Sequence, residues 1–453
     1  MRAKRLWATV LCAGLTASVL TGCGAEQEST NTQVSDTTVE TNNAEDVAAT
    51  DAGENEASEQ PAEKVELHYA YWQDSLGGYL EECKAKFEAE NENVTIILEP
   101  TAWAEYWTKL ETAATGGSVA DVFQMNGPNI HKYADAGVIL SLDDYIASAG
   151  LDMNNYPEAM NQLYNVDGVQ YGVPIDYDTI GLWYNKELFD AAGVAYPDET
   201  WTWDDLVNAA EKLTNPDTGV YGIAAGYADQ GGFYNTVFAA GGYIINEDHT
   251  ASGFDQEATI QGLECWIDLM EKGYSPSQAS LTENADYVQF MSGKIAMLYA
   301  GDWFAATFAA PESDFADKCD VALLPTINGN RASVIHGKAN CVSASSQNPD
   351  VAWAWVNYLA GEEANEILGN SGAAIPAHTA YSGLFFEQYP QYNMEIFAKE
   401  ATECAYTYPT SKGFNEWADV VWNELVPVYS LEASLEDACA NITTQMNDIL
   451  AMQ

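Results

Sequence analysis

Large aromatic residues stand beside carboxylates or amides where the sequence predicts the ends of two β-strands. Residues 65–75, VELHYAYWQDS, alternate like a half-buried strand that ends in Trp72, Gln73 and Asp74. Residues 120–126, ADVFQMN, read as another strand and end in Asn126. An aromatic face suits the weakly positive C–H bonds of a sugar ring, and carboxylates or amides satisfy its hydroxyls. We therefore expect a site for an uncharged polyol with Trp72, Asp74 and Asn126 among its contacts.

The overall composition agrees with such a site and excludes several other partners. The chain has 13 Trp and 26 Tyr but only 17 basic residues, and no cluster of Arg or Lys suggests an anion pocket. With 68 acidic residues its net charge is −51, which repels nucleic acid and favours a soluble monomer with a solvated acidic surface. A chain of 453 residues is too long for one ordinary core, so two lobes are expected.

Other candidate contacts have structural interpretations that the sequence leaves open. Trp72 could also close the core, and Asp74 could cap the helix that follows it. Trp103 lies on an amphipathic helix from which it could reach the cleft. Asp302 is a candidate contact that we expect rather to cap a helix. Three further aromatics could either contact the ligand at the rim of the site or pack in the core: Tyr177, Tyr234 and Trp417.

The first residues have the pattern of an export signal. Arg2, Lys4 and Arg5 precede an apolar run over residues 6–20, too short for an ordinary membrane span. The run closes on Leu20-Thr21-Gly22-Cys23, which resembles a bacterial lipobox and implies cleavage before Cys23 and lipidation of its thiol. We expect a signal peptide over residues 1–22; the alternative is a plain secretory signal with a chance cysteine.

Residues 23–63 are expected to be a disordered acidic tether that follows the lipidated cysteine. Positions 24–63 hold eleven Asp or Glu and no Lys, Arg, Phe, Tyr or Trp, so they cannot bury enough apolar surface to order themselves. Six further cysteines lack C-x-x-C spacing and nearby His ligands, so no metal site and no cofactor is expected. Disulfide pairing and free thiols stay open for them: Cys83, Cys265, Cys319, Cys341, Cys404 and Cys439.

Beyond residue 64 predicted strands alternate with predicted helices. This alternation predicts an α/β fold whose lobes have mainly parallel sheets flanked by helices. Ligands of such sheets lie outside the carboxyl ends of the strands, where Trp72 and Asn126 are expected. A second lobe is expected to contain a helix capped by Thr200 or Thr202 and strands at GIAAGY, residues 222–227, and KIAMLYAGDWF, residues 294–304.

The order of several stretches resembles the extracellular carbohydrate-binding proteins of ATP-driven importers, the group that includes maltose-binding protein. The stretches are YWQDSLGGYL, ADVFQMNGPNIHKYADAGVILSLDDYI, YGVPIDYDTIGLWYNKELFDAAG, TWTWDDLVNAAEKL, GKIAMLYAGDWF and NPDVAWAWVNYLAG. The resemblance implies the type II periplasmic-binding-protein fold, with a ligand cleft at the hinge between two lobes. It implies a first lobe of residues 64–174 plus 325–376 and a second lobe of residues 175–324 plus 377–453.

The resemblance also implies individual contacts. The family places an aromatic at the position of Trp303 and often a carboxylate at that of Asp178; hinge hydrogen bonding is the alternative for Asp178. Where this chain has Met125 and Asn126, maltose-type members can have an aromatic, so the specific sugar does not carry over.

The function implied is that of a binding protein and not of an enzyme. A sugar or oligosaccharide would bridge the lobes, drive hinge closure and be delivered to an ABC permease. The protein would be a monomer held by lipid on Cys23 at the extracellular face of a bacterial, Gram-positive membrane.

Two alternatives to sugar capture stay open. A secreted glycosidase would use the same aromatics with two carboxylates flanking the bond, although no pair stands out. A protein of the same fold could instead cage a polyamine or cationic peptide between aromatics and carboxylates.

Overall fold

The computed structural model describes residues 64–72 and 74–453. The predicted signal peptide, Cys23 and the predicted tether lie outside the described residues. The described part is an α/β protein with two principal sheets, one of five strands and one of three. Helices in the order of the chain are α1 (Gly77–Glu90), α2 (Trp103–Gly116), α3 (Gly127–Asp135), α4 (Asp143–Ala149), α5 (Glu158–Leu163), α6 (Lys186–Ala192), α7 (Trp203–Leu213), α8 (Tyr234–Ala240), α9 (Glu257–Glu271), α10 (Gln278–Glu283), α11 (Asp286–Met291), α12 (Ala305–Phe308), α13 (Pro349–Leu359), α14 (Glu362–Ser371), α15 (Ser382–Phe386), α16 (Glu395–Glu403), α17 (Phe414–Tyr429) and α18 (Leu435–Leu450).

The five-stranded sheet contains the two strands whose ends were predicted to bear site residues, β1 and β3. Its order is β2-β1-β3-β12-β6, formed by β2 (Val94–Pro100), β1 (Val65–Tyr71), β3 (Val122–Asn126), β12 (Lys338–Val342) and β6 (Val173–Pro174). β1 pairs in parallel with β2 and β3, so the prediction of parallel strands is confirmed for this part of the sheet. β12 comes from far along the chain and pairs antiparallel with β3 and β6. The carboxyl ends of β1 and β3 lie at the same edge, which brings Trp72 and Asn126 to one side of the sheet.

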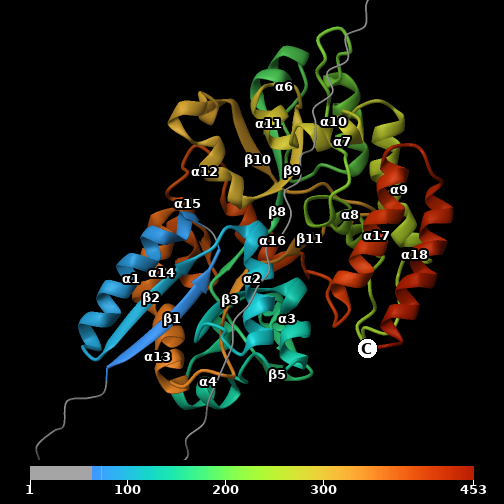
Figure 1. Cartoon of the computed structure of the whole chain (residues 1–453). Helices are drawn as coiled ribbons and strands as arrows, with labels where there is room; N and C mark the ends of the chain where they lie inside the picture. The colour runs from blue at the N-terminus through green and yellow to red at the C-terminus, as the bar shows by residue number, and fades with distance from the viewer. Residues whose placement is uncertain (1–63, 73) are drawn as a thin grey trace, which may run out of the picture. The chain divides into compact units, whose positions relative to one another are not determined.

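One face of this sheet is sealed by α1, α13 and α14 (Figure 1). The alternation of β1 turns Leu67, Tyr69 and Tyr71 inward. The Trp355 ring on α13 meets Tyr69 at 6.1 Å and Phe87 of α1 at 5.1 Å between ring centroids. This packing holds β1 rigidly, so the residue that follows it has a fixed place.

The three-stranded sheet differs from the prediction of a mainly parallel second sheet. Its order is β10-β8-β9, with β10 (Cys319–Ala322), β8 (Ile180–Asn185) and β9 (Met297–Gly301), and both pairings are antiparallel. β8 follows closely after β6 of the first sheet. β9 and β10 come much later in the chain, and both run in the direction opposite to β8. The parallel prediction is therefore wrong for this sheet, while the two sheets with their helices agree with the predicted α/β class.

The segment GIAAGY, predicted to be a strand, does not form a β-strand in the structure. Tyr221 makes a single bridge to Ile295, and Ala224 N donates to Met297 O at 3.1 Å. Gly222 lies so close to α7 that an added Cβ would be 2.3 Å from Ala210 O, so this segment follows the helix instead of the sheet. α7 itself begins as predicted, with Thr202 and Asp205 forming a reciprocal capping box.

Short strands connect the two sheets. β7 (Asp176–Tyr177) pairs with β13 (Ile375–Pro376), and β11 (Ser333–Ile335) pairs with β14 (Ala405–Thr407). Asp178 and His336 form an isolated bridge between the first two connections. Gly337 is required there because an added Cβ would lie 2.3 Å from Asp176 O. These paired connections form a continuous hinge region.

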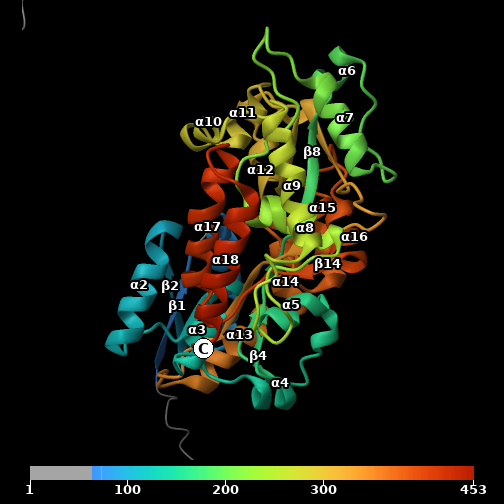
Figure 2. The ribbon, with the colours of Figure 1, turned by 90° about the vertical axis from the view of Figure 1, so that its right-hand side faces the viewer.

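The C-terminal helices α17 and α18 form a hairpin that packs on α9 (Figure 2). The stripe of α17 that faces inward contains Phe414, Trp417, Val421 and Leu425. α17 also contacts α3, which follows β3 of the five-stranded sheet. The contact brings the outward side of α17 next to the edge where β3 ends.

Candidate functional site

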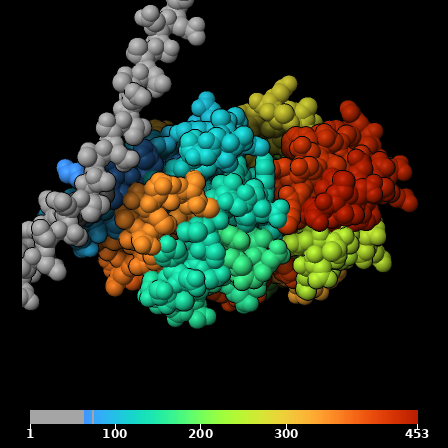
Figure 3. Space-filling view, turned by 60° about the horizontal axis from the view of Figure 1, so that its bottom comes forward, coloured from blue at the N-terminus to red at the C-terminus, as the bar shows by residue number. Residues whose placement is uncertain are grey.

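A cavity of about 600 Å³ lies between α2 and α3 on one side and α17 with residues 227–229 on the other. Figure 3 shows the red surface of the C-terminal helices beside the cyan and green surface of the N-terminal half. The cavity size is typical of a small-molecule site. Its walls are Trp103, Trp107, Glu111, Asn126, Pro128, Asn129, Lys132, Tyr133, Tyr227, Ala228, Asp229, Tyr408, Phe414, Asn415, Ala418, Asp419 and Trp422.

Four aromatic rings build the wall at the end of β1. Tyr106 and Leu110 form the buried face of α2, which turns Trp103 and Trp107 toward the cavity. The Trp72 ring lies behind them, with centroid distances of 5.3 Å to Trp103 and 5.6 Å to Trp107. Trp103 keeps 52% of its surface exposed although it is a large apolar side chain. An indole held from behind and open in front is ready to stack on a ligand.

The opposite wall is built around Trp422 of α17. This residue lies off the buried stripe of its helix and is 51% exposed. Its ring packs edge-on against Tyr227 at 4.8 Å, and Tyr227 packs in turn on Tyr429 at 5.7 Å. The cavity therefore has an open indole on each side.

Polar groups lie between the two walls. Tyr408 donates its hydroxyl to Asp229 Oδ2 at 2.9 Å, and Gln230 N donates to Asp229 Oδ1 at 2.6 Å. Asn129 donates to Asn126 Oδ1 at 2.8 Å. These bonds fix the orientation of the carboxylate and the amides before any ligand arrives. Lys132 is paired with Glu111 at 3.0 Å, so its charge is largely offset.

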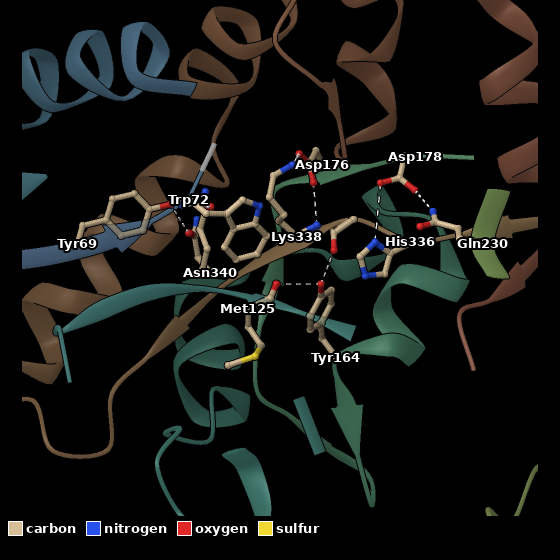
Figure 4. A network of polar contacts seen from close by, with 12 residues as sticks. Tyr69, Trp72, Met125, Tyr164, Asp176, Asp178, Gln230, His336, Lys338 and Asn340 are labelled. Atoms are coloured by element: carbon tan, nitrogen blue, oxygen red, sulfur yellow. Dashed lines mark hydrogen bonds and ion pairs between the residues drawn. The ribbon is translucent and has the colours of Figure 1, made fainter. Parts of the chain in front are cut away.

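A polar network lies in the hinge region, and Figure 4 shows its side chains. Asp178 accepts a hydrogen bond from the Gln230 amide, and its Oδ2 lies 3.9 Å from His336 Nδ1. The His336 ring is 5.1 Å from that of Tyr408, which lines the cavity. A displacement of the hinge would therefore move groups that face the cavity.

A buried ion pair lies beside this network. Lys338 contacts Asp176 with its ammonium group, and Asp176 Oδ1 accepts from Lys338 N at 2.7 Å. Burial raises the pKa of Asp176, and the Lys338 charge partly offsets that effect. The pair ties β7 to the start of β12 at the hinge.

The structure brings some predicted contacts into the cavity and places others elsewhere. Trp103 and Asn126 line it, and Trp72 supports the wall from behind. Asp178 has hinge partners, as in the alternative interpretation. The side chain of Asp74 lies outside the described residues. Trp303 follows β9, is 40% exposed and does not line this cavity.

Three aromatics for which the sequence allowed either a rim position or core packing are all buried. Tyr177 and Tyr234 are each 2% exposed, and Trp417 is 0% exposed and donates its indole N–H to Ser411 Oγ at 3.0 Å. Trp417 lies on the inward stripe of α17, so a rim position is wrong for it. Tyr234 packs on Tyr408 at 5.5 Å and thereby supports a ring that lines the cavity.

Sequence reasoning missed Tyr227, Asp229, Tyr408 and Trp422. A usable signal existed for Trp422, because it stands off the apolar stripe of its predicted helix, where a buried tryptophan is not needed. Asp229 begins a distorted π-helical turn, residues Asp229–Phe233, and Tyr408 lies in an irregular segment far away in the chain. Only the fold brings them together, and no local pattern marks them.

Asp302 is a buried carboxyl without the partners a charged group requires. It is 3% exposed, and its Oδ1 has no hydrogen-bond partner within the described part of the chain. Burial raises its pKa well above the ordinary value, and the nearby carboxylates of Asp178 and Asp176 add to the rise. The folded chain therefore binds the proton of Asp302 more tightly than the unfolded chain does.

Asp302→Asn is expected to stabilise the protein at pH 7. In the wild type the unfolded chain releases a proton that the folded chain keeps, so stability falls as pH rises above the unfolded pKa, near about 3.9. The gain should shrink as pH falls through about 4 and vanish well below it, where Asp302 is protonated in both states. Urea unfolding at both pH values measures this gain in the free energy of unfolding. Asp314→Asn is the control, because the side chain of Asp314 is 99% exposed. A variant less stable than wild type at pH 7 would show that the carboxylate is charged and bound.

Two further searches cover the described residues only. In residues 64–72 and 74–453 no group of three or more His, Cys, Asp or Glu is placed to hold a metal ion. No helix in the same part of the chain is long and apolar enough to cross a bilayer.

Comparisons with known proteins agree with this arrangement. A putative binding protein of Brucella abortus is 24% identical over 405 residues, covering 85% of this chain and 93% of that protein. The maltodextrin-binding protein MdxE of Bacillus subtilis is 24% identical over 309 residues, covering 67% of this chain and 71% of that protein. An ABC substrate-binding protein of Listeria monocytogenes, solved in complex with cycloalternan, matches with a TM-score of 0.77 and 27% identity over 86% of this chain and 100% of that one. The family described as bacterial extracellular solute-binding protein matches residues 69–366, and the chain belongs to that family.

Proposed function

We propose that the protein captures a sugar or oligosaccharide outside the cell and delivers it to an ABC permease. The observation that carries the proposal is the pair of half-exposed indoles, Trp103 and Trp422, on opposite walls of one cavity. Between them lie amides and a carboxylate already oriented by hydrogen bonds. Flat aromatics and fixed acceptors are what the two surfaces of a sugar require. The names of the Bacillus and Listeria relatives support the same ligand class.

Ligand capture would proceed by hinge closure. The cavity takes groups from both sides of the hinge region, so a ligand that contacts both favours the closed state. The lobe boundaries near residues 174, 324 and 376 stay proposals; the pairing of β7 with β13 supports the first and the third. Trp303, open to solvent just after β9, would meet the ligand when the lobes close. Asp302 would support it as a neutral neighbour.

The protein would act as a lipid-anchored monomer on the extracellular face of the cytoplasmic membrane. The lipobox-like sequence ending at Cys23 and the acidic composition of residues 24–63 support this part. Catalysis is not part of the proposal, because Asp229 and Glu111 are held by partners that suit binding.

Calorimetric titration of a panel of oligosaccharides tests the proposal. The panel should contain linear and branched chains of glucose, mannose, galactose and arabinose, each titrated at low and high salt. We expect heat from at least one sugar. Its affinity should be the same at both salt concentrations, because the ligand is uncharged. Chromatography of the recovered sugar should show it intact. Failure of every sugar to give heat would overturn the proposal.

A polyamine is the second candidate because three carboxylates line the cavity. Glu111, Asp229 and Asp419 are there with the aromatics, against the single ammonium of Lys132. Aromatics and carboxylates together can hold an amine. Spermidine titrated under the same conditions should give no heat if sugar is the ligand. Heat that falls steeply with salt would favour the amine.

A further inference from the structure

A second, smaller cavity of about 270 Å³ adjoins the main one. The two share Tyr227, Ala228 and Trp422 as lining residues. Trp422 and Tyr227, packed edge-on at 4.8 Å, therefore stand between the two spaces as a common wall. We call the smaller space the side pocket. Its other walls are Ala224, Gly226, Gly231, Trp266, Gln278, Leu281, Thr282, Ala285, Asp286, Leu298 and Tyr299.

The side pocket repeats the chemistry of the main cavity. Trp422 offers an exposed ring, and Asp286 offers a carboxylate whose Oδ1 already accepts from Tyr287 N at 2.7 Å. Asp286 Oδ2 takes no part in that hydrogen bond and can accept from a ligand hydroxyl. Gln278 accepts from Tyr227 N at 2.8 Å, which holds the common wall in place. No Lys or Arg lines the side pocket, so an anionic group is not its occupant.

The size of the side pocket limits what it can hold. Ligand sites for drug-sized molecules measure about 300–1,000 Å³, so a space of 270 Å³ suits a fragment the size of one sugar unit. A straight chain lying in the main cavity would pass Trp422 without entering. A chain with a branch or a bend at that point would place one unit on each side of the indole.

We propose that the ligand is a branched or bent oligosaccharide that straddles the Trp422–Tyr227 wall, with one sugar unit in the side pocket. This inference rests on the proposed function of the main cavity. The carboxylate of Asp286 would accept from the hydroxyls of that unit, and the face of Trp422 would stack on its ring. Trp422 thus decides which shape of sugar is taken, because both of its sides are in use.

Filling the side pocket tests the proposal. The probe is the oligosaccharide that binds best in the panel, compared with its homologue that lacks one unit. Ala285 is exposed at the edge of the side pocket, so Ala285→Trp should obstruct it without disturbing a core. We expect the affinity for the full oligosaccharide to fall about tenfold, the size of one good contact, while the affinity for the shorter homologue stays the same. Asp286→Ala should act in the same direction.

Ala147→Trp is the matched control, since Ala147 is exposed on α4 and lines neither cavity. It should change neither affinity. Equal losses for both sugars, or no loss for either, would overturn the side-pocket proposal while the main cavity remains a sugar site. No heat from any sugar would instead overturn the proposed function itself. Wild-type preference for the linear member of a linear and branched pair of equal mass would also contradict the inference.

Discussion

Lys338→Met is expected to lower the free energy of unfolding by about 3–5 kcal/mol, because it leaves the buried carboxylate of Asp176 without its cation. The side chains of this pair are 12% and 3% exposed, so water cannot replace the lost charge. Asp176 would keep only hydrogen bonds such as that from the backbone N–H of residue 338. Urea unfolding at pH 7 measures the loss.

Lys86→Met is the matched control for this variant. Lys86 pairs with Glu363 at 2.8 Å, but both side chains are more than 40% exposed. A pair of this kind contributes about 0–1 kcal/mol, so the control should be nearly neutral. The double variant Asp176→Asn with Lys338→Met should recover much of the loss, because no buried charge remains. A single Lys338→Met as mild as the control would show that water reaches the pair in solution.

Trp103→Ala and Trp422→Ala are each expected to weaken sugar binding about thirtyfold, which corresponds to about 2 kcal/mol for a central aromatic contact. The two indoles come from opposite walls and pack on different neighbours, Trp72 and Tyr227. Their effects should therefore add, and the double variant should lose about a thousandfold in affinity. Calorimetry with the best sugar of the panel measures all three.

Tyr196→Ala is the control for this series, since Tyr196 is 38% exposed and does not line the cavity. Its affinity should equal that of the wild type. Thermal unfolding should confirm that every variant is folded, as expected for side chains that are half exposed. Full affinity in the double variant would remove the observation on which the proposed function stands.

Two contacts between the same pair of connecting segments form the hinge region. Asp176 and Asp178 lie two positions apart in one connection, and His336 and Lys338 lie two positions apart in another. Asp176 and Lys338 form a buried ion pair, whereas Asp178 and His336 lead toward Tyr408 and the cavity. A rigid ion pair next to a looser contact suits a hinge that must bend at a fixed place.

Local sequence was sufficient where one element decides the outcome by itself. The alternation of β1 fixed which of its residues face the core and put Trp72 just after its end. The Thr202 cap set the start of α7, and the ends of β1 and β3 located one edge of the site. Period, capping and strand direction depend on neighbours in the chain, so they can be read from it.

The sequence by itself determined the two-lobe α/β class, the aromatic and acidic residue chemistry, and the placement of Trp72, Trp103 and Asn126 at or behind the wall of the main cavity. Only the tertiary structure decided that Trp422 and not Trp417 faces the cavity, because that depends on how α17 packs against α9 and α3. It also decided the antiparallel second sheet and the meeting of Asp229 with Tyr408, 179 positions away. Such contacts join distant segments through the shared packing of both lobes, and no local pattern carries that information.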